Sequence, residues 1–301
     1  MPAFIRFSRQ LPDLRHIIGV LLSSLLALCL SACSAVQLTY QNAPELSYWW
    51  IDGYLDINDA QSAKLRQGLS SLHAWHRQQE LPVYLATLNK LQKAADADTT
   101  PEQVCALYAE LRARLQPVFD QFEPTAAALA PGLGQAQLEH IARQLDKRHR
   151  KWQHDWLSLS PEQRQAKRVD QLTDRAEMFY GRLEEPQRAV LRVGLRVVPM
   201  DVSLLEREST RRQSDLLQTL RELQVEKPGS ANTKAALRKG FERWLDSPDP
   251  AYRDYARQTT QALCKTFAAL HNASTPTQRA QFVRTLQDYR DDVRSLMART
   301  N

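Results

Sequence analysis

The chain has 301 residues, of which 43% are hydrophobic, and 40 Lys and Arg against 34 Asp and Glu give it a net charge of +6. This composition is typical of a folded protein and excludes an intrinsically disordered chain. Only 9 residues are glycine, against about 21 at the usual frequency of ~7%, and this deficit disfavours sheet-rich and nucleotide-binding folds and favours helices.

Residues 1–32 have the layout of an export signal. Three arginines within residues 6–15 precede an uncharged apolar run of 14 residues at 17–30. That run is shorter than the ~18–20 residues needed to span a bilayer and has the length of the hydrophobic region of a signal peptide. It leads into the sequence Leu-Ser-Ala-Cys, in which the cysteine is Cys33.

The tetrapeptide that ends at Cys33 resembles the lipobox of bacterial lipoproteins in all four positions. The resemblance implies removal of residues 1–32 and attachment of diacylglycerol and a further acyl chain, such as palmitate, to Cys33. Two or three acyl chains anchor a protein stably. By the sorting of lipoproteins in Gram-negative bacteria, Ser34 after the cysteine implies the outer membrane, at its periplasmic face. The alternative is an ordinary signal peptide with a chance cysteine, or a core helix.

We therefore predict a lipidated tether at residues 33–43 and a single helical domain at residues 44–301. Removal of residues 1–32 leaves 37 basic and 33 acidic side chains, a net charge of +4. No later segment is an uncharged stretch of about 18 residues, so we expect the body to be soluble and tethered, without a spanning helix.

The first predicted helix occupies residues 44–55. Leu46, Trp49 and Trp50 share one face of it, and Tyr48 belongs to a second apolar strip. Because a helix that is apolar nearly all round is usually buried, we expect this helix in the core. The alternative is an aromatic belt that lies on the bilayer, since the short tether keeps the helix within ~36 Å of the membrane.

The rest of the chain is predicted to be helical, and almost every proline lies at a helix boundary. A helix from Asn58 to about residue 97 has a kink or restart at Pro82, and further helices follow at 101–115, 118–130, 135–158, 161–184, 186–198, 201–226, 233–246, 250–272 and 276–299. Four helix starts contain a capping box, in which a capping oxygen is followed three residues later by Gln. They begin at Asn58, Thr100, Ser160 and Thr275.

The fold class follows from these patterns. The unequal spacing of the four capping boxes excludes a solenoid repeat, and no run of alternating apolar and polar residues indicates a strand. We predict an all-α multi-helix bundle of about ten or eleven mostly antiparallel helices with no sheet. A candidate hinge lies at residues 226–232, and the last helices are expected to pack back on the rest.

Cys105 and Cys264 remain after the signal is removed and Cys33 is lipidated. Both lie in helical patterns beside large apolar residues. An even pair in an oxidising compartment favours a disulfide, whereas two separately buried thiols are the alternative. Two cysteines without nearby histidines are not a zinc site, so no metal or cofactor is predicted.

His73, His76 and Glu80 are the strongest candidates for chemistry. They lie three and four residues apart on one helix, a spacing that can place ligands or an acid–base pair together. Such pairs are also common on solvated helix faces, and the metal-binding sequence His-Glu-x-x-His is absent. No hydrolase, P-loop or zinc motif occurs elsewhere, so we predict that the protein is not an enzyme.

A basic run at residues 146–156 is the sharpest charge feature. Its cations are Lys147, Arg148, Arg150 and Lys151, which we predict to bind an anionic surface. An exported protein does not meet nucleic acid, so anionic lipid, lipopolysaccharide phosphates or an acidic envelope protein are the expected partners. The alternative is a solvated basic helix face whose tryptophans point inward.

Three segments show a family resemblance, and it covers essentially the whole mature chain. They are Cys33 to Ala43, Tyr48 to Tyr54, and Ala74 to Tyr84. In these the chain resembles a family of uncharacterised proteobacterial lipoproteins that carry a domain of unknown function, a resemblance that implies no catalytic residues. A weaker likeness, at Leu159 to Gln163, is to the Leu-Thr-x-x-Gln element of small helical periplasmic chaperones of the Spy type.

Three functions are compatible with the sequence. The first is a non-catalytic, lipid-anchored protein that binds a partner protein or envelope component. The second is a periplasmic chaperone or foldase, which predicts exposed apolar residues on a concave helical surface. The third is an enzyme of unrecognised type built around His73, His76 and Glu80. We favour the first.

Overall fold

The computed structural model describes residues 36–298, so the predicted signal at residues 1–32 and the lipidation site Cys33 lie outside the described part. The chain divides into two units between Asn42 and Ala43. In the first unit, residues 36–41 are helical. The second unit contains the helices that follow.

The second unit is all-α, as predicted, and residues 43–298 contain no strand. Its helices are α2 (Ala43–Leu55), α3 (Asp59–Trp75), the π-helix η1 (His76–Glu80), α4 (Leu81–Ala94), α5 (Pro101–Ala113), α6 (Leu115–Leu129), the 3-10 helix η2 (Ala130–Gly132), α7 (Gln135–Trp156), α8 (Pro161–Tyr180), α9 (Glu185–Val197), α10 (Val202–Glu226), α11 (Ser230–Leu245), α12 (Pro250–Asn272) and α13 (Pro276–Ala298). No helix in the part of the chain that the structure describes is long and apolar enough to cross a membrane.

The helix starts form as the capping residues predict. At the first of them the Asn58 side chain accepts from the Gln61 N–H at 3.0 Å, and the Gln61 side chain accepts from the Asn58 N–H at 3.2 Å. The other three predicted capping boxes have the same reciprocal bonds, at Thr100–Gln103, Ser160–Gln163 and Thr275–Gln278. Each box satisfies two backbone N–H groups that a helix terminus otherwise leaves without a partner.

Two helix junctions have an unusual backbone conformation. Pro82 lies in the first turn of α4, directly after the π-helix η1. The wider π turn accommodates a proline, which has no N–H to donate and clashes with the carbonyl four residues earlier. At the candidate hinge, residues 227–229 lie between the end of α10 at Glu226 and the start of α11 at Ser230 and are not helical. Between them Lys227 adopts the left-handed conformation, with φ 43°.

One arrangement of glutamines occurs twice in the domain. In its first copy the Gln61 side chain donates to the Gly132 carbonyl at 3.0 Å. The amides of Gln61 and Gln137 bond to each other, and Gln137 donates to the Asp56 carbonyl at 2.8 Å. The bonds join the start of α3 to the start of α7.

The second copy joins the start of α9 to the start of α13. The Gln187 side chain donates to the Ala273 carbonyl at 3.0 Å. The amides of Gln187 and Gln278 bond to each other, and Gln278 donates to the Arg182 carbonyl at 2.9 Å. The four groups occupy the same relative positions as in the first copy.

Close helix crossings repeat in the same way. A Cβ atom at Gly68 of α3 would lie 2.2 Å from the Thr125 hydroxyl of α6, and one at Gly194 of α9 would lie 2.0 Å from the Thr266 hydroxyl of α12. Gly68 follows Gln61 at the same spacing along the helix as Gly194 follows Gln187. The helices α2, α3, α6 and α7 therefore correspond to α8, α9, α12 and α13.

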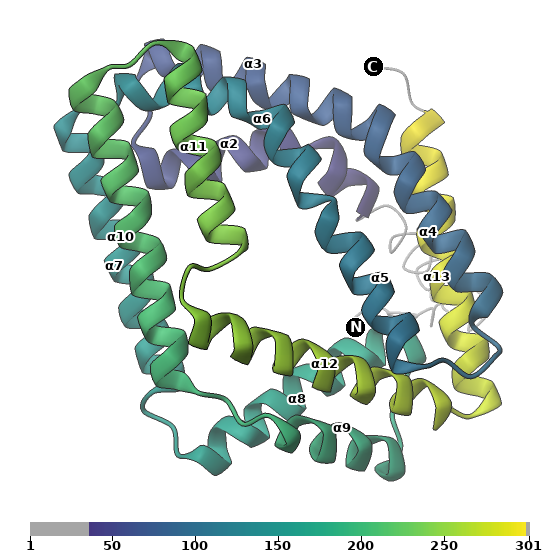
Figure 1. The fold of residues 1–301 in the computed structure, drawn as a ribbon. Coiled ribbons are helices and arrows are strands. Elements are labelled where there is room, and N and C mark those ends of the chain that lie inside the picture. Colours follow the sequence, from purple (N-terminus) through teal and green to yellow (C-terminus); the bar gives the residue numbers. More distant parts are fainter. Residues whose placement is uncertain (1–35, 299–301) are drawn as a thin grey trace, which may run out of the picture. The chain divides into compact units, whose positions relative to one another are not determined.

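The domain thus has two halves, α2–α7 and α8–α13. The middle helices of each half pack on the other half. Helix α4 packs on α13 as α10 packs on α7, and α5 packs on α12 as α11 packs on α6. Figure 1 shows α10 beside α7, and α4 beside α13. The last helices thus pack back on the rest, as predicted, and the two halves of the domain are interleaved.

The core consists of separate clusters that follow this organisation. One, between α2, α3 and α6, contains Leu65, and its counterpart between α8, α9 and α12 contains Leu191. Both leucines are completely buried. A third cluster between η2, α7 and α10 includes Leu138 and Leu223. Burial in several small clusters keeps the long helices in place at many points.

Candidate functional site

The outer face of α2 is exposed, so the expectation that this helix is buried is wrong. The side chains of Trp49 and Trp50 are 61% and 63% exposed, and Leu46 is 51% exposed. These three residues, here called the aromatic strip, share one helix face because they are three and four positions apart. Large apolar residues that remain exposed together mark candidate interaction surfaces.

The inner face of α2 holds the helix firmly. Tyr48 is buried, its hydroxyl lies 3.0 Å from the Ser62 hydroxyl, and the Arg66 guanidinium stacks 3.6 Å from its ring. Ile51 packs on the cluster around Leu65. Helix α2 packs on α3 and α7, and these contacts bury the Tyr48 face and leave the aromatic strip outside.

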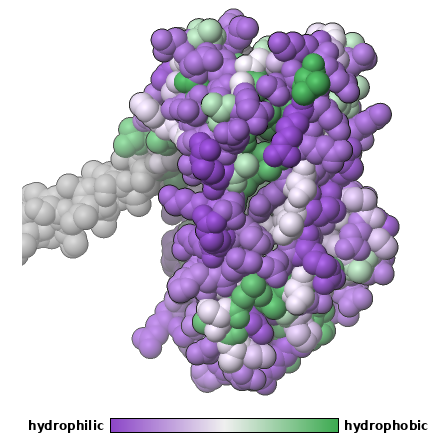
Figure 2. Space-filling view, turned by 90° about the vertical axis from the view of Figure 1, so that its left-hand side faces the viewer, coloured by the Kyte–Doolittle hydropathy of each residue, from purple (hydrophilic) through white to green (hydrophobic). Residues whose placement is uncertain are grey.

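The basic run lies on the surface of α7, and half of its charge is paired. Arg150 forms an ion pair with Asp146, and Lys151 forms one with Asp155 at 2.9 Å. Lys147 and Arg148 are exposed and make no ion pair within residues 36–298. Figure 2, on the side of α7 and α10, shows a mostly hydrophilic face with hydrophobic side chains in small separate areas.

The two tryptophans of the basic run are partly buried. Trp152 stacks on the ring of His149, with centroids 6.4 Å apart. Lys167 of α8 lies 4.6 Å from the Trp156 ring and donates to the carbonyl of Asp155. The positive charge of Lys167 at the C-terminus of α7 interacts favourably with the helix dipole.

A groove of about 530 Å³ lies along α8 and α9. Three arginines at four-residue spacing on α9 line it, Arg188, Arg192 and Arg196, and we call it the arginine groove. Its wall also contains apolar side chains, such as Val169, and the carboxylates of Glu162 and Asp170.

The three arginines differ in their pairing. Arg188 pairs with Glu177 at 2.7 Å, and Arg192 pairs with Glu185. Arg196 makes no ion pair in the described part of the chain. The four-residue spacing was visible in the sequence, but only the packing of α9 on α8 places the three side chains along one groove.

The Glu80 carboxylate is buried and forms an ion pair with Arg114, and its negative charge partly offsets the effect of burial on the pKa of His76. It is 0% exposed, and its carboxylate accepts from Arg114 Nε at 2.8 Å and from Arg114 Nη2. His76 packs on the Tyr84 ring, with centroids 5.6 Å apart, and burial lowers the pKa of its imidazole. Among residues 36–298, His73, His76 and Glu80 belong to no group of three side chains that could hold a metal ion.

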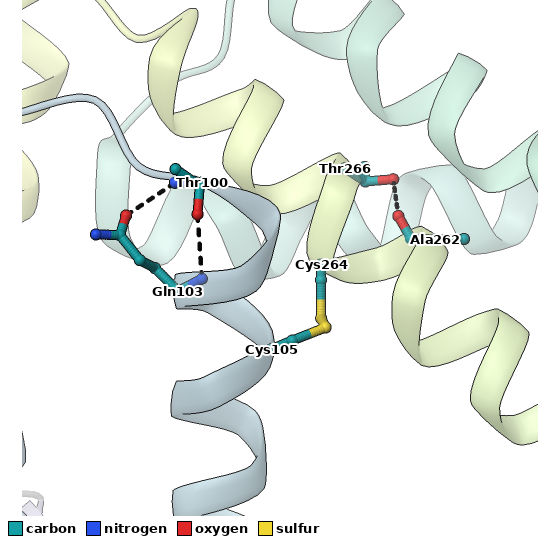
Figure 3. Close-up of a disulfide and its surroundings, with 6 residues drawn as sticks. All are labelled: Thr100, Gln103, Cys105, Ala262, Cys264 and Thr266. Atoms are coloured by element: carbon teal, nitrogen blue, oxygen red, sulfur yellow. Dashed lines mark hydrogen bonds between the residues drawn. A yellow bond between two sulfur atoms is a disulfide. The ribbon is translucent and has the colours of Figure 1, made fainter.

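Cys105 of α5 and Cys264 of α12 are joined by a disulfide, with the sulfur atoms 2.05 Å apart and the Cα atoms 5.4 Å apart. Figure 3 shows the bond one turn after the capping box of Thr100 and Gln103, at the start of α5. At the corresponding helix pair, α11 on α6, no disulfide is present. There Arg238 pairs with Glu123 at 2.8 Å.

Comparison with known proteins identifies a family. No curated protein and no solved structure matches the chain. A family model described as a family of unknown function, DUF6279, matches residues 53–231. The match covers more than half of the chain, including the basic run and the arginine groove, and agrees with the predicted resemblance to a domain of unknown function. The chain belongs to the DUF6279 family, whose function is unknown.

Proposed function

We propose that this protein is a lipid-anchored protein of the Gram-negative envelope that binds an anionic envelope component without catalysing a reaction. Acyl chains on Cys33 anchor it at the periplasmic face of the outer membrane. The support for the anchor is the export signal at residues 1–32 and the lipobox-like Leu-Ser-Ala-Cys sequence.

The distribution of charge carries the proposal. Residues 135–197, which contain α7, α8 and α9, have thirteen Lys and Arg against nine Asp and Glu. The remaining mature residues have equal numbers of basic and acidic side chains. The whole positive excess of the mature chain therefore belongs to these three helices.

Three cations of this region are accessible and have no ion-pair partner in the described part of the chain. Lys147 and Arg148 are exposed on α7, and Arg196 lines the arginine groove without a carboxylate partner in the described part of the chain. Arginine binds phosphate and carboxylate groups through paired hydrogen bonds. Each cation near an anionic surface contributes about 1 kcal/mol to the free energy of binding, and salt reduces this contribution.

The contacts of the catalytic candidates favour binding over turnover. The Glu80 carboxylate is occupied by Arg114, which lies at the junction of α5 and α6. His76 packs among Trp75 and Tyr84. Within residues 36–298 these contacts are those of a packed helix junction, which supports a binding role more than acid–base catalysis.

Calorimetric titration of the mature protein with purified lipopolysaccharide, at low and high salt, tests the proposal. We expect Lys147→Glu/Arg148→Glu and Arg192→Glu/Arg196→Glu each to weaken binding about tenfold or more, and high salt to weaken the wild type. Dephosphorylated lipopolysaccharide shows whether phosphate is the group recognised.

The matched control is Arg221→Glu/Lys239→Glu, which makes the same charge change at exposed positions of α10 and α11. The control should bind as the wild type does. If all three double variants lose affinity equally, net charge alone accounts for binding. If none of the double variants binds more weakly than the wild type, the proposed binding surface is wrong.

A second candidate, the chaperone, is favoured by one observation. Tyr108, Leu111 and Leu115 are more than 40% exposed and follow one another along α5 and into α6. Exposed apolar side chains of this kind can bind unfolded segments. Suppression of client aggregation that is lost in Tyr108→Ser/Leu111→Ser would favour this function over anion binding.

A further inference from the structure

We propose that the aromatic strip of α2, Leu46, Trp49 and Trp50, docks into the interfacial layer of the bilayer that holds the acyl chains of Cys33. The inference rests on the lipid anchor of the proposed function. It adds a second contact with the membrane, made by the folded domain itself.

The chemistry of the strip fits a membrane interface. Tryptophan has a large apolar ring and one N–H donor, and it is enriched where lipid headgroups meet acyl chains. Two adjacent tryptophans and one leucine on a single helix face provide the apolar side of an interfacial helix.

No unpaired charge of α2 opposes insertion. The only charged residues of this helix are Glu45 and Asp52. Glu45 pairs with Arg66, and Asp52 accepts from the Ile57 N–H at 2.9 Å. Both carboxylates are held by groups outside the aromatic strip, so docking of the strip need not bury a free carboxylate.

The strip is held ready for docking. The ring of Trp49 meets the ring of the buried Tyr48 edge-on, with centroids 5.8 Å apart, and the ring of Trp50 lies 5.0 Å from that of Tyr54. Since Tyr48 is fixed by contacts with α3, the ring of Trp49 is restrained before it meets a partner. Restraint of this kind reduces the entropy lost on binding.

The duplicated fold shows that these tryptophans are not required for packing. Helix α8 is the counterpart of α2, and its core residue Ala176 corresponds to Ile51, so Asp174 and Arg175 stand where α2 has Trp49 and Trp50. Asp174 and Arg175 are exposed, as Trp49 and Trp50 are, so the second copy packs without a tryptophan at either position.

The length of chain before α2 identifies the bilayer as the occupant. Helix α2 begins at Ala43, ten residues after Cys33. Ten residues span at most ~36 Å when extended, and the helical turn at residues 36–41 shortens this reach. A tether this short holds the strip near the membrane at a high effective concentration.

Fluorescence of the lipidated protein in vesicles tests the inference. The vesicles contain phosphatidylethanolamine and phosphatidylglycerol, with or without bromine on the upper acyl carbons. Trp49→Phe/Trp50→Phe removes the two reporters while it keeps an apolar strip. Trp244→Phe is the matched control, because Trp244 of α11 is also exposed.

We expect the emission that Trp49→Phe/Trp50→Phe removes to be blue-shifted and mostly quenched by the brominated lipid. The emission that Trp244→Phe removes should be neither blue-shifted nor quenched by the brominated lipid. Emission of Trp49 and Trp50 that is blue-shifted but not quenched would mean that a protein, such as a second copy of this chain, covers the strip. Emission that is not shifted would mean that water covers it.

Either of these last two results overturns the inference. The anchor is tested separately, by mass spectrometry of the N-terminal peptide and by flotation of the protein with the vesicles. If Cys33 carries acyl chains and the strip is not quenched, the proposed anchor stands and the docking surface is wrong. If Cys33 carries no acyl chain, the anchor itself is wrong.

Discussion

The disulfide between Cys105 and Cys264 should provide a large part of the stability of the domain. The two residues are 159 positions apart, and the bond joins α5, from the first half of the duplication, to α12, from the second. In the chain-entropy description, closing a loop of this length removes about 17 cal/mol/K from the unfolded chain, which corresponds to about 5 kcal/mol at 25 °C.

Urea unfolding of the non-reduced wild type, the two single Cys→Ala variants and the double variant tests this value. Each variant removes the same bond, so all three should lose about 5 kcal/mol and unfold at similar urea concentrations. Dithiothreitol should lower the midpoint of the wild type to near theirs and leave the variants unchanged. Packing between α5 and α12 remains in every case, so helical circular dichroism at zero urea should persist.

Two results would refute this reasoning. One is the titration of two free thiols in the denatured, non-reduced wild type. The other is a midpoint that dithiothreitol does not change, which would mean that closing the loop does not restrict the unfolded chain. The slope of the unfolding transition is compared as well, because a cross-linked unfolded chain exposes less surface to urea.

Three further predictions concern single side chains. Gly194→Ala should lower the free energy of unfolding by about 1–3 kcal/mol, because its Cβ would lie 2.0 Å from the Thr266 hydroxyl. Gly240→Ala, whose Cβ would meet nothing closer than 3.9 Å, should raise it by up to about 1 kcal/mol; thermal melts that rank the two variants the other way contradict the crossing. Burial lowers the pKa of His271 from its usual 6.5. As the pH falls, this imidazole is therefore protonated in the unfolded chain before it is protonated in the folded chain. Stability should be complete above about pH 6.5 and fall below it, and His271→Gln should remove part of that slope in urea titrations at several pH values. Glu80→Ala should lower the free energy of unfolding by about 2–3 kcal/mol, because it removes the buried carboxylate that accepts two hydrogen bonds from the partly exposed Arg114; an unchanged stability with a lost cellular phenotype would instead indicate a catalytic role.

Much of the fold follows from short-range interactions that the sequence displays directly. The box of Asn58 and Gln61 closes hydrogen bonds across three residues, so it forms wherever the local backbone turns into a helix. Helical periodicity and boundary prolines are equally local. For the same reason the sequence indicated where Cys105 and Cys264 lie on their helices, but it left open whether they meet, since their distance depends on how α5 packs on α12.

What only the tertiary structure decided involves residues far apart in the chain. The apolar pattern of α2 is the same for a buried helix and for one that presents Trp49 and Trp50 outward, and the packing of α3 and α7 on the Tyr48 face selects the second. Glu80 is spaced to pair with His76, but Arg114 reaches its carboxylate from the corner between α5 and α6. The duplication was equally hidden, because it is preserved in a few long-range hydrogen bonds and close crossings and not in a repeated sequence. Helix formation depends on neighbours within a few residues, whereas the exposure of a face and the partner of a buried charge depend on which other helices pack there.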